Sequence, residues 1–172
     1  MPPHGSWEGT IELVAGRYAI VDGGVNGGKT NAARGMLQTF SVAPGGPPGT
    51  PPASVGTIQM VDYAFRISLP KPFHGRGVVA IPNRGKHLHE IALVKTPPGK
   101  TAKDVLALFH SGAPPPPGYE IHELLGALDG GHTAYVRFAL GRGHYIALCL
   151  VSFGNSNRTH ADAGMVGAFD VA

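Results

Sequence analysis

The segment "ALCLVSFGNSNRTHADAGMVGAFDV" (residues 147–171) decides the fold, because its two apolar runs flank a polar loop and hold three unusual side chains. Cys149 is the only cysteine of the chain, His160 follows it after ten intervening residues, and Met165 follows after four more. Two apolar runs around a loop predict a β-hairpin, which would bring thiol, imidazole and thioether to one end of a sheet. The alternative is an ordinary hairpin in which the cysteine and the methionine are only core residues.

The run "HYIALCLVSF" (144–153) is apolar at every second position on both faces, which is typical of a central strand buried on both sides. By the two-residue period of a strand, Tyr145, Ala147 and Cys149 share one face. His160 ends the polar loop, and Gly164 permits a tight turn before Met165. The hairpin would therefore present three donors of the kinds that bind soft and borderline metals.

A thiolate, two imidazoles and a weak thioether form the donor set that suits one copper ion cycling between Cu(I) and Cu(II). The second imidazole would come from "IPNRGKHLHEIALV" (81–94), where His87 and His89 stand at the entrance to an expected strand. Only one of these two histidines is needed, and the residues alone leave both open. The remaining histidines form no ligand-spaced set.

The composition favours many short strands joined by turns. The chain holds 26 glycines and 16 prolines, with 42% hydrophobic and 15% charged residues. The net charge is +3, but the basic residues are scattered rather than clustered, which argues against a nucleic-acid partner. No stretch reaches the roughly 18–20 apolar residues of a membrane span. One cysteine excludes an internal disulfide.

The expected elements are nearly all strands, so the fold class is all-β, a Greek-key β-sandwich with one short helix. The helix is expected at "KTAKDVLALFHSG" (100–112), where Thr101 is a plausible N-cap and Asp104 follows three residues later. A proline- and glycine-rich linker is expected at 44–54. Strands are expected at 9–22 (two short ones), 35–42, 56–68, 76–83, 89–95, 132–140, 144–153 and 164–171.

The N-terminal part of the chain echoes its end. "GRYAIVD" (16–22) and "TNAARGMLQTFSV" (30–42) match "GHYIALC" (143–149) and "THADAGMVGAFDV" (159–171). The match pairs Tyr18 with Tyr145, Asp22 with Cys149, Asn31 with His160 and Met36 with Met165. We interpret residues 1–43 as a partial, degenerate repeat that has lost its thiol and its imidazole. An incomplete repeat leaves strand edges unpaired, so we expect this segment to pack on the main domain (55–172) or on a second chain, which would make a homo-oligomer.

The pattern of the last 28 residues, with Tyr145, Cys149, His160 and "GMVGAFDV", resembles that of the cupredoxins, the family of small type 1 (blue) copper proteins. An Asn-x-Gly loop that ends in a histidine at a strand start adds to the resemblance, with Asn83, Gly85 and His89 at its positions. The resemblance covers roughly residues 55–172. The chain also resembles uncharacterised bacterial proteins with tandem cupredoxin-like repeats.

The resemblance implies one mononuclear copper ion bound by His89, Cys149, His160 and Met165, with Met165 on the axis. It also implies electron transfer with a redox protein partner, a periplasmic or extracellular location, and electron entry at the edge of His160. Glu90, next to His89, either ties the cysteine loop by a hydrogen bond or approaches the ion and gives a red copper site. A cupredoxin scaffold without a redox role, which stores copper or only binds a partner, is the alternative.

The sequence gives no support for an enzyme. The acidic residues show no pairing that suggests acid–base catalysis. The run "GGVNGGKT" (23–30) imitates part of a phosphate-binding loop, but it is one residue short and precedes no expected helix. A thiol enzyme would need Cys149 to be exposed beside an activating base, whereas its strand is expected to be buried.

Overall fold

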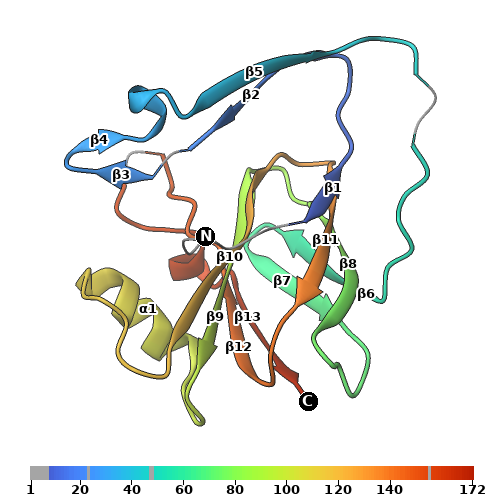
Figure 1. The fold of residues 1–172 in the computed structure, drawn as a ribbon. Helices are drawn as coiled ribbons and strands as arrows, with labels where there is room; N and C mark the ends of the chain where they lie inside the picture. Colours follow the sequence, from blue (N-terminus) through green and yellow to red (C-terminus); the bar gives the residue numbers. More distant parts are fainter. Residues whose placement is uncertain (1–7, 23, 47–48, 155) are drawn as a thin grey trace. The chain divides into compact units, whose positions relative to one another are not determined.

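The computed structural model describes residues 8–22, 24–46, 49–154 and 156–172 (Figure 1). They divide into two compact units. One unit contains residues up to Ile11 together with Pro51–Ala172 and is called the sandwich unit; the other, Glu12–Thr50, is called the hairpin unit. The expected N-terminal segment is therefore divided, because Gly9–Ile11 pairs within the sandwich unit.

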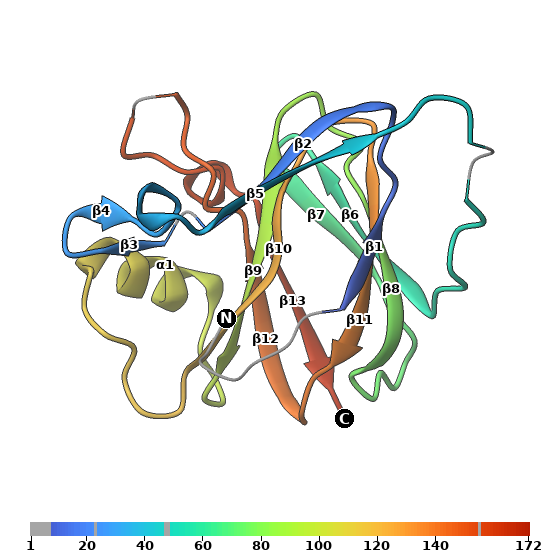
Figure 2. The same cartoon turned by 45° about the horizontal axis from the view of Figure 1, so that its top comes forward.

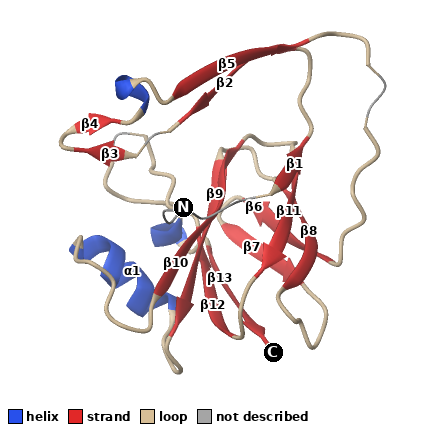
Figure 3. Cartoon of the chain, viewed as in Figure 1, coloured by secondary structure: helices blue, strands red, loops and turns tan. Residues whose placement is uncertain are grey.

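Two sheets form the sandwich unit, as Figures 2 and 3 show. The first sheet has the order β1-β11-β8-β6-β7, in which β6 and β8 are parallel and the other pairs antiparallel. Its strands are β1 (Gly9–Ile11), β6 (Gly56–Val61), β7 (Ala64–Ser68), β8 (Arg76–Pro82) and β11 (Thr133–Ala139). The second sheet, β10-β9-β12-β13, is antiparallel throughout. Its strands are β9 (His89–Thr96), β10 (Glu120–Leu128), β12 (Gly143–Leu148) and β13 (Val166–Val171).

The main core lies between the two sheets. A smaller core lies on the other face of β12, the face turned away from the first sheet. Tyr145, Ala147 and Cys149 all belong to the main core, so the expected shared face is confirmed. Ile146 and Leu148 face the other way and pack with α1 (Ala102–Ser111). β12 is apolar on both faces because it is covered on both.

The helix begins as expected from its capping residues. The carboxylate of Asp104 accepts hydrogen bonds from the Thr101 amide at 2.8 Å and from the Thr101 hydroxyl at 2.7 Å. Val105 is fully buried against the second sheet, and Gly112 ends the helix with a φ of 63°. Among the described residues, no helix is both long and apolar enough to span a bilayer.

The all-β sandwich with one α-helix is confirmed, but three details differ from expectation. β10 was not expected, because irregular register between Glu123 and Leu125 and between Leu125 and Leu128 removes the alternation that marks a strand. The stretch 56–68 is a hairpin, β6–β7, rather than one strand. β12 ends at Leu148 rather than at residue 153. It ends there because the Cys149 carbonyl accepts its hydrogen bond from Ala161 in the following loop, at 2.8 Å.

The hairpin unit is built around one long antiparallel pair. Its elements are β2 (Gly16–Val21), β3 (Val25–Asn26), β4 (Lys29–Thr30), a 3₁₀ turn η1 (Ala32–Arg34) and β5 (Leu37–Val42). β2 pairs with β5, and β3 pairs with β4 across a tight turn. Residues 25–30, for which no strand was expected, thus form a small two-stranded ladder. Residues 43–55, which include the expected linker at 44–54, carry no helix or strand where they are described.

The β2–β5 pair repeats the geometry of the β12–β13 pair. Tyr18 lies opposite Phe40 as Tyr145 lies opposite Phe169, and both ring pairs are stacked, with centroids 5.5 and 5.6 Å apart. Each tyrosine hydroxyl donates to the carbonyl four residues earlier, at 2.6 and 2.8 Å. The register therefore matches along both pairs, from the tyrosine to the loop.

The loops of the two hairpins also match. The Met36 amide donates to the Asn31 carbonyl at 3.0 Å, and the Met165 amide donates to the His160 carbonyl at 3.0 Å. Each loop contains one 3₁₀ turn that ends in a glycine, with a φ of 101° in η1 and 105° in the second turn, η2 (Ala161–Ala163). Where the C-terminal hairpin has a thiol and an imidazole, the N-terminal one joins two side chains directly: Asn31 Nδ2 donates to Asp22 Oδ2 at 3.0 Å.

We predict that Asn31→Ala loosens the loop of the hairpin unit. Loss of a hydrogen bond worth about 0.5–1.5 kcal/mol would raise the open population by about 2- to 10-fold. Cleavage by trypsin after Lys29 and Arg34, followed by mass spectrometry, measures this opening. Gln38→Ala is the matched control, since the Gln38 side-chain amide, within the part of the chain that is described, donates only to the carbonyl of its neighbour Thr39. Equal cleavage rates in the two variants would contradict the role of the Asn31 contact.

Candidate metal centre

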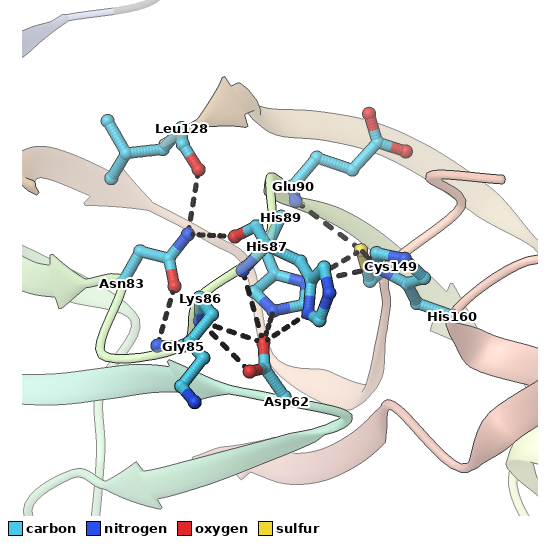
Figure 4. A network of polar contacts seen from close by, with 10 residues as sticks. All are labelled: Asp62, Asn83, Gly85, Lys86, His87, His89, Glu90, Leu128, Cys149 and His160. Atoms are coloured by element: carbon cyan, nitrogen blue, oxygen red, sulfur yellow. Dashed lines mark hydrogen bonds and ion pairs between the residues drawn. The ribbon is translucent and has the colours of Figure 1, made fainter. Parts of the chain in front are cut away.

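Three potential metal donors meet at one end of the sandwich (Figure 4). His89 opens β9, Cys149 follows the last residue of β12, and His160 precedes η2. The Nδ1 atoms of the two histidines are 3.0 Å apart, and Cys149 Sγ lies 3.8 Å from Nδ1 of His89 and 3.5 Å from Nδ1 of His160. Exposure is 0% for His89 and Cys149 and 4% for His160. Among the described residues, His89, Cys149 and His160 form a group whose ligand atoms all lie within 4.8 Å of one another, close enough to hold one metal ion.

The spacing of these atoms fits one ion. Metal bonds of about 2.0–2.1 Å to nitrogen and 2.3 Å to sulfur, at trigonal to tetrahedral angles, separate two nitrogens by about 3.3–3.6 Å and nitrogen from sulfur by about 3.6–3.8 Å. The observed sulfur–nitrogen distances are 3.5 and 3.8 Å. The nitrogen–nitrogen distance of 3.0 Å is that of an N–H···N hydrogen bond between the two imidazoles. A shift of a few tenths of an ångström would convert it to the spacing of two ligands.

The Met165 backbone is hydrogen-bonded to the backbone of His160 and to that of Cys149. Its amide donates to the His160 carbonyl at 3.0 Å, and its carbonyl accepts from the Cys149 amide at 3.3 Å. The residue is fully buried and belongs to the same core cluster as Cys149. These hydrogen bonds fix the backbone of Met165 beside those of Cys149 and His160.

The protonation of the donors follows from burial. Burial raises the pKa of the Cys149 thiol, and a hydrogen bond from the Glu90 amide to Sγ, at 3.4 Å, opposes that shift. Burial also lowers the pKa of His160, and the neighbouring His89 lowers it further. His160 is thus a neutral imidazole at neutral pH, which is the form that binds a metal. A buried thiol of raised pKa is a poor nucleophile, but a cation at the site would stabilise its thiolate.

Glu90 ties the two halves of the site together. Its amide donates to Cys149 Sγ, and its carboxylate accepts from the Leu150 amide at 3.1 Å. In Figure 4 this carboxylate points away from the sulfur. Of the two roles considered for Glu90, this geometry favours the hydrogen bond that ties the cysteine loop.

The two candidate histidines of the upstream loop are separated clearly. The His89 side chain is 0% exposed and points to Cys149 and His160, whereas the His87 side chain is 54% exposed. His87 stacks on Tyr63, with ring centroids 5.6 Å apart, and its Nδ1 lies 3.2 Å from the Asp62 carboxylate. The structure therefore places His89, and not His87, among the donors.

The edge of His160, where the resemblance implies electron entry, is covered by two aromatic rings. The rings of Tyr63 and Phe153 lie against it, with centroids 4.9 and 4.7 Å away, and these two rings are 5.0 Å from each other. Both covering residues are half-buried. The polar loop 154–159 suggested exposure, but the aromatic residue just before it turns inward over the imidazole.

Asn83 holds the loop that leads to His89. Its side chain is fully buried, and its Nδ2 donates to the carbonyls of His87 at 2.9 Å and Leu128 at 2.8 Å. Its Oδ1 accepts from the Gly85 amide at 2.9 Å. The Asn-x-Gly motif that the sequence singled out is thus a structural device, which fixes the approach of β9 to the site.

Asp62 and Tyr63 are the neighbours of the site that the sequence did not indicate. Both lie in the β6–β7 turn, and Asp62 Oδ1 is 2.9 Å from His89 Nε2. A hydrogen bond from the Lys86 amide, followed by those from His89 and His87, holds the pKa of Asp62 well below its usual range despite the opposing effect of desolvation. No signal in the sequence could have found this residue, because it is 27 positions from His89 and belongs to the other sheet.

Comparison with known proteins gives limited likenesses. No family model matches the chain, and no curated protein matches it. Two auracyanins, which are cupredoxins, have similar solved structures. Auracyanin B is 22% identical, with a TM-score of 0.43 over 72% of this chain and 92% of its own. The dithionite-reduced auracyanin of the photosynthetic bacterium Roseiflexus castenholzii is 22% identical, with a TM-score of 0.39 over 70% of this chain and 99% of its own. The function of the chain is inferred from the geometry of its donors and not from this likeness.

We predict that Asn83→Ala destabilises the sandwich unit by about 1–3 kcal/mol, because it leaves the buried Leu128 carbonyl without its donor. Urea unfolding followed by circular dichroism measures the loss. Asn157→Ala, in the exposed loop before His160, is the control and should change the free energy of unfolding by less than about 0.5 kcal/mol. An equal effect of the two substitutions would show that Asn83 does not hold the loop.

Proposed function

We propose that this protein is a small type 1 copper protein that transfers single electrons. His89, Cys149 and His160 would hold one copper ion, and Met165 would add a weak thioether ligand. The observation that supports this most is the buried meeting of one thiol with two imidazole Nδ1 atoms, all within 4.8 Å of one another. The ion would supply the Cu(II)/Cu(I) couple.

The chemistry of the donors favours copper over harder ions. Thiolate and thioether are soft ligands, and imidazole suits copper, whereas magnesium and calcium take oxygen ligands. Zinc would accept the thiolate and the imidazoles, but Met165, buried in the same core cluster as Cys149, offers a ligand type associated with copper. Glu90 keeps its carboxylate on the Leu150 amide, which favours a blue site over a red one.

The chain itself performs the remaining tasks of an electron carrier. Burial of all three donors excludes water, and the backbone hydrogen bonds among Cys149, His160 and Met165 hold the ligands at a fixed spacing. A ligand set that does not move serves both oxidation states with little rearrangement. The Glu90 amide on Sγ would tune the potential through the electron density of the sulfur.

A redox protein partner and a location outside the cytoplasm belong to this proposal. Because Tyr63 and Phe153 cover His160, the partner would approach these rings rather than a bare imidazole. We also propose that residues 1–43 are the remnant of a second copy of the ligand hairpin, matched over 16–42, in which the Asp22–Asn31 hydrogen bond stands where the ion would be. One copper ion per chain is then expected.

Copper titration of the purified protein tests the proposal. We expect an intense thiolate-to-copper absorption band at one equivalent, its loss in Cys149→Ser, and its retention with a higher potential in Met165→Leu. Met36→Leu is the matched control, since Met36 occupies the equivalent position of the hairpin unit, and it should alter neither band nor potential. A colourless copper complex of the wild-type protein would favour a storage or interaction role, and a band that persists in Cys149→Ser would remove the thiolate from the site.

A further inference from the structure

The Asp62 carboxylate lies directly behind one of the donors, on the side away from the sulfur. Asp62 sits in the turn between β6 and β7 of the first sheet, whereas His89 opens β9 of the second sheet. Its Oδ1 is 2.9 Å from His89 Nε2, while His89 Nδ1 faces Cys149 and His160 (Figure 4). One imidazole therefore links a carboxylate to the candidate metal centre.

The carboxylate is fixed in place by the loop that precedes β9. The Lys86 amide donates to both of its oxygens, at 2.9 and 3.1 Å, and the His87 amide and ring lie 3.4 and 3.2 Å from Oδ1. A Cβ at Gly85 would stand 2.3 Å from Oδ1 and 2.9 Å from His89 Nε2, so only glycine admits this approach. The loop is thus built to place a carboxylate against the far nitrogen of His89.

The contact fixes the tautomer of His89. An ionised carboxylate only accepts hydrogen bonds, so the ring nitrogen that faces it must carry the proton. A neutral imidazole has a single N–H, and with that proton on Nε2 the Nδ1 atom keeps its lone pair, which in this structure accepts the hydrogen bond from His160 Nδ1 at 3.0 Å. This lone pair points to where Cys149 and His160 converge. The orientation and the tautomer that a ligand needs are both set before an ion binds.

We propose that Asp62 is the positioning residue of the metal centre, which holds His89 in the Nε2–H tautomer and raises the electron donation of its Nδ1 to the ion. This inference rests on the proposed function and deepens it. A negative charge one imidazole away favours the more highly charged Cu(II) over Cu(I), so Asp62 lowers the potential of the site. Glu90 and Asp62 then act on different ligands, one on the thiolate and one on an imidazole.

The first test needs no copper and no substitution. In metal-free, ¹⁵N-histidine-labelled wild-type protein, long-range ¹H–¹⁵N correlation spectra identify which nitrogen of each imidazole carries the proton. We expect His89 to show a protonated Nε2 and an unprotonated Nδ1. A protonated Nδ1 with a bare Nε2 would overturn the proposal, whether or not the protein binds copper.

The second test compares Asp62→Asn with Asp170→Asn. We expect Asp62→Asn to bind Cu(II) about 10- to 100-fold more weakly, as is typical when the partner of a ligating histidine is removed. Cu(I) affinity should fall less, and each tenfold difference between the two losses raises the potential by about 59 mV. Asp170→Asn is the matched control, because Asp170 accepts from His144 Nδ1 at 2.7 Å on the exposed surface.

The outcomes separate the two claims. Wild-type-like affinity and potential in Asp62→Asn, in a protein that carries the thiolate-to-copper band, would overturn the role of Asp62 and leave the proposed function intact. A protonated His89 Nε2 in a wild-type protein that binds no copper would overturn the proposed function and leave the Asp62–His89 contact and its tautomer established. If Asp62→Asn fails to fold, the wild-type spectrum decides the proposal by itself.

Discussion

The pairing of β9 with β12 is the constraint on which the candidate metal centre depends. Their antiparallel register sets Leu148 opposite Ala92, so that the chain leaves β12 at Cys149 beside the first residues of β9. The two strands are more than 45 residues apart in sequence, yet the Glu90 amide reaches the sulfur directly. A slip of one residue would turn Cys149 out of the main core and separate the donors. The candidate site therefore depends first on the register of β9 and β12, which brings the donor side chains together.

Hydrophobic burial and donor chemistry support each other at this end of the molecule. The same core that packs Tyr145 and Ala147 surrounds the thiol, and the rings of Tyr63 and Phe153 close over His160. Burial works against charge on the free thiol and on His160, so both groups are neutral, and a bound cation would stabilise the thiolate form of Cys149. On the first sheet, Asp62 supplies one ionised oxygen that the donors of the second sheet lack. The two sheets thus make different electrostatic contributions to one small volume.

Much of this could be predicted from the sequence, because the decisive features are local or periodic. The alternation around Tyr145, the capping residues of α1 and the Gly-Met turn before β13 each report on their own neighbours, and the sandwich with one α-helix follows from them. The spacing of Cys149, His160 and Met165 likewise lies within one hairpin. What escaped prediction depends on contacts across the sheets: β10, whose irregular register hides its alternation, and Asp62, which meets His89 only after the sandwich closes. The aromatic cover of His160 also escaped, because a polar loop follows Phe153 immediately.

The hairpin unit shows what determines the backbone shape of the loop between Cys149 and Met165. It reaches the same backbone shape, with the same turn and the same hydrogen bonds, although an amide and a carboxylate stand where the imidazole and the thiol would be. The conformation of the loop is therefore set by its main-chain hydrogen bonds and does not require a bound ion. A loop with such a fixed backbone would impose its own bond angles on a metal ion, so the ion would adapt to the polypeptide. In the proposed role of a one-electron carrier, such stiffness would keep each exchange fast, since little atomic motion would accompany it.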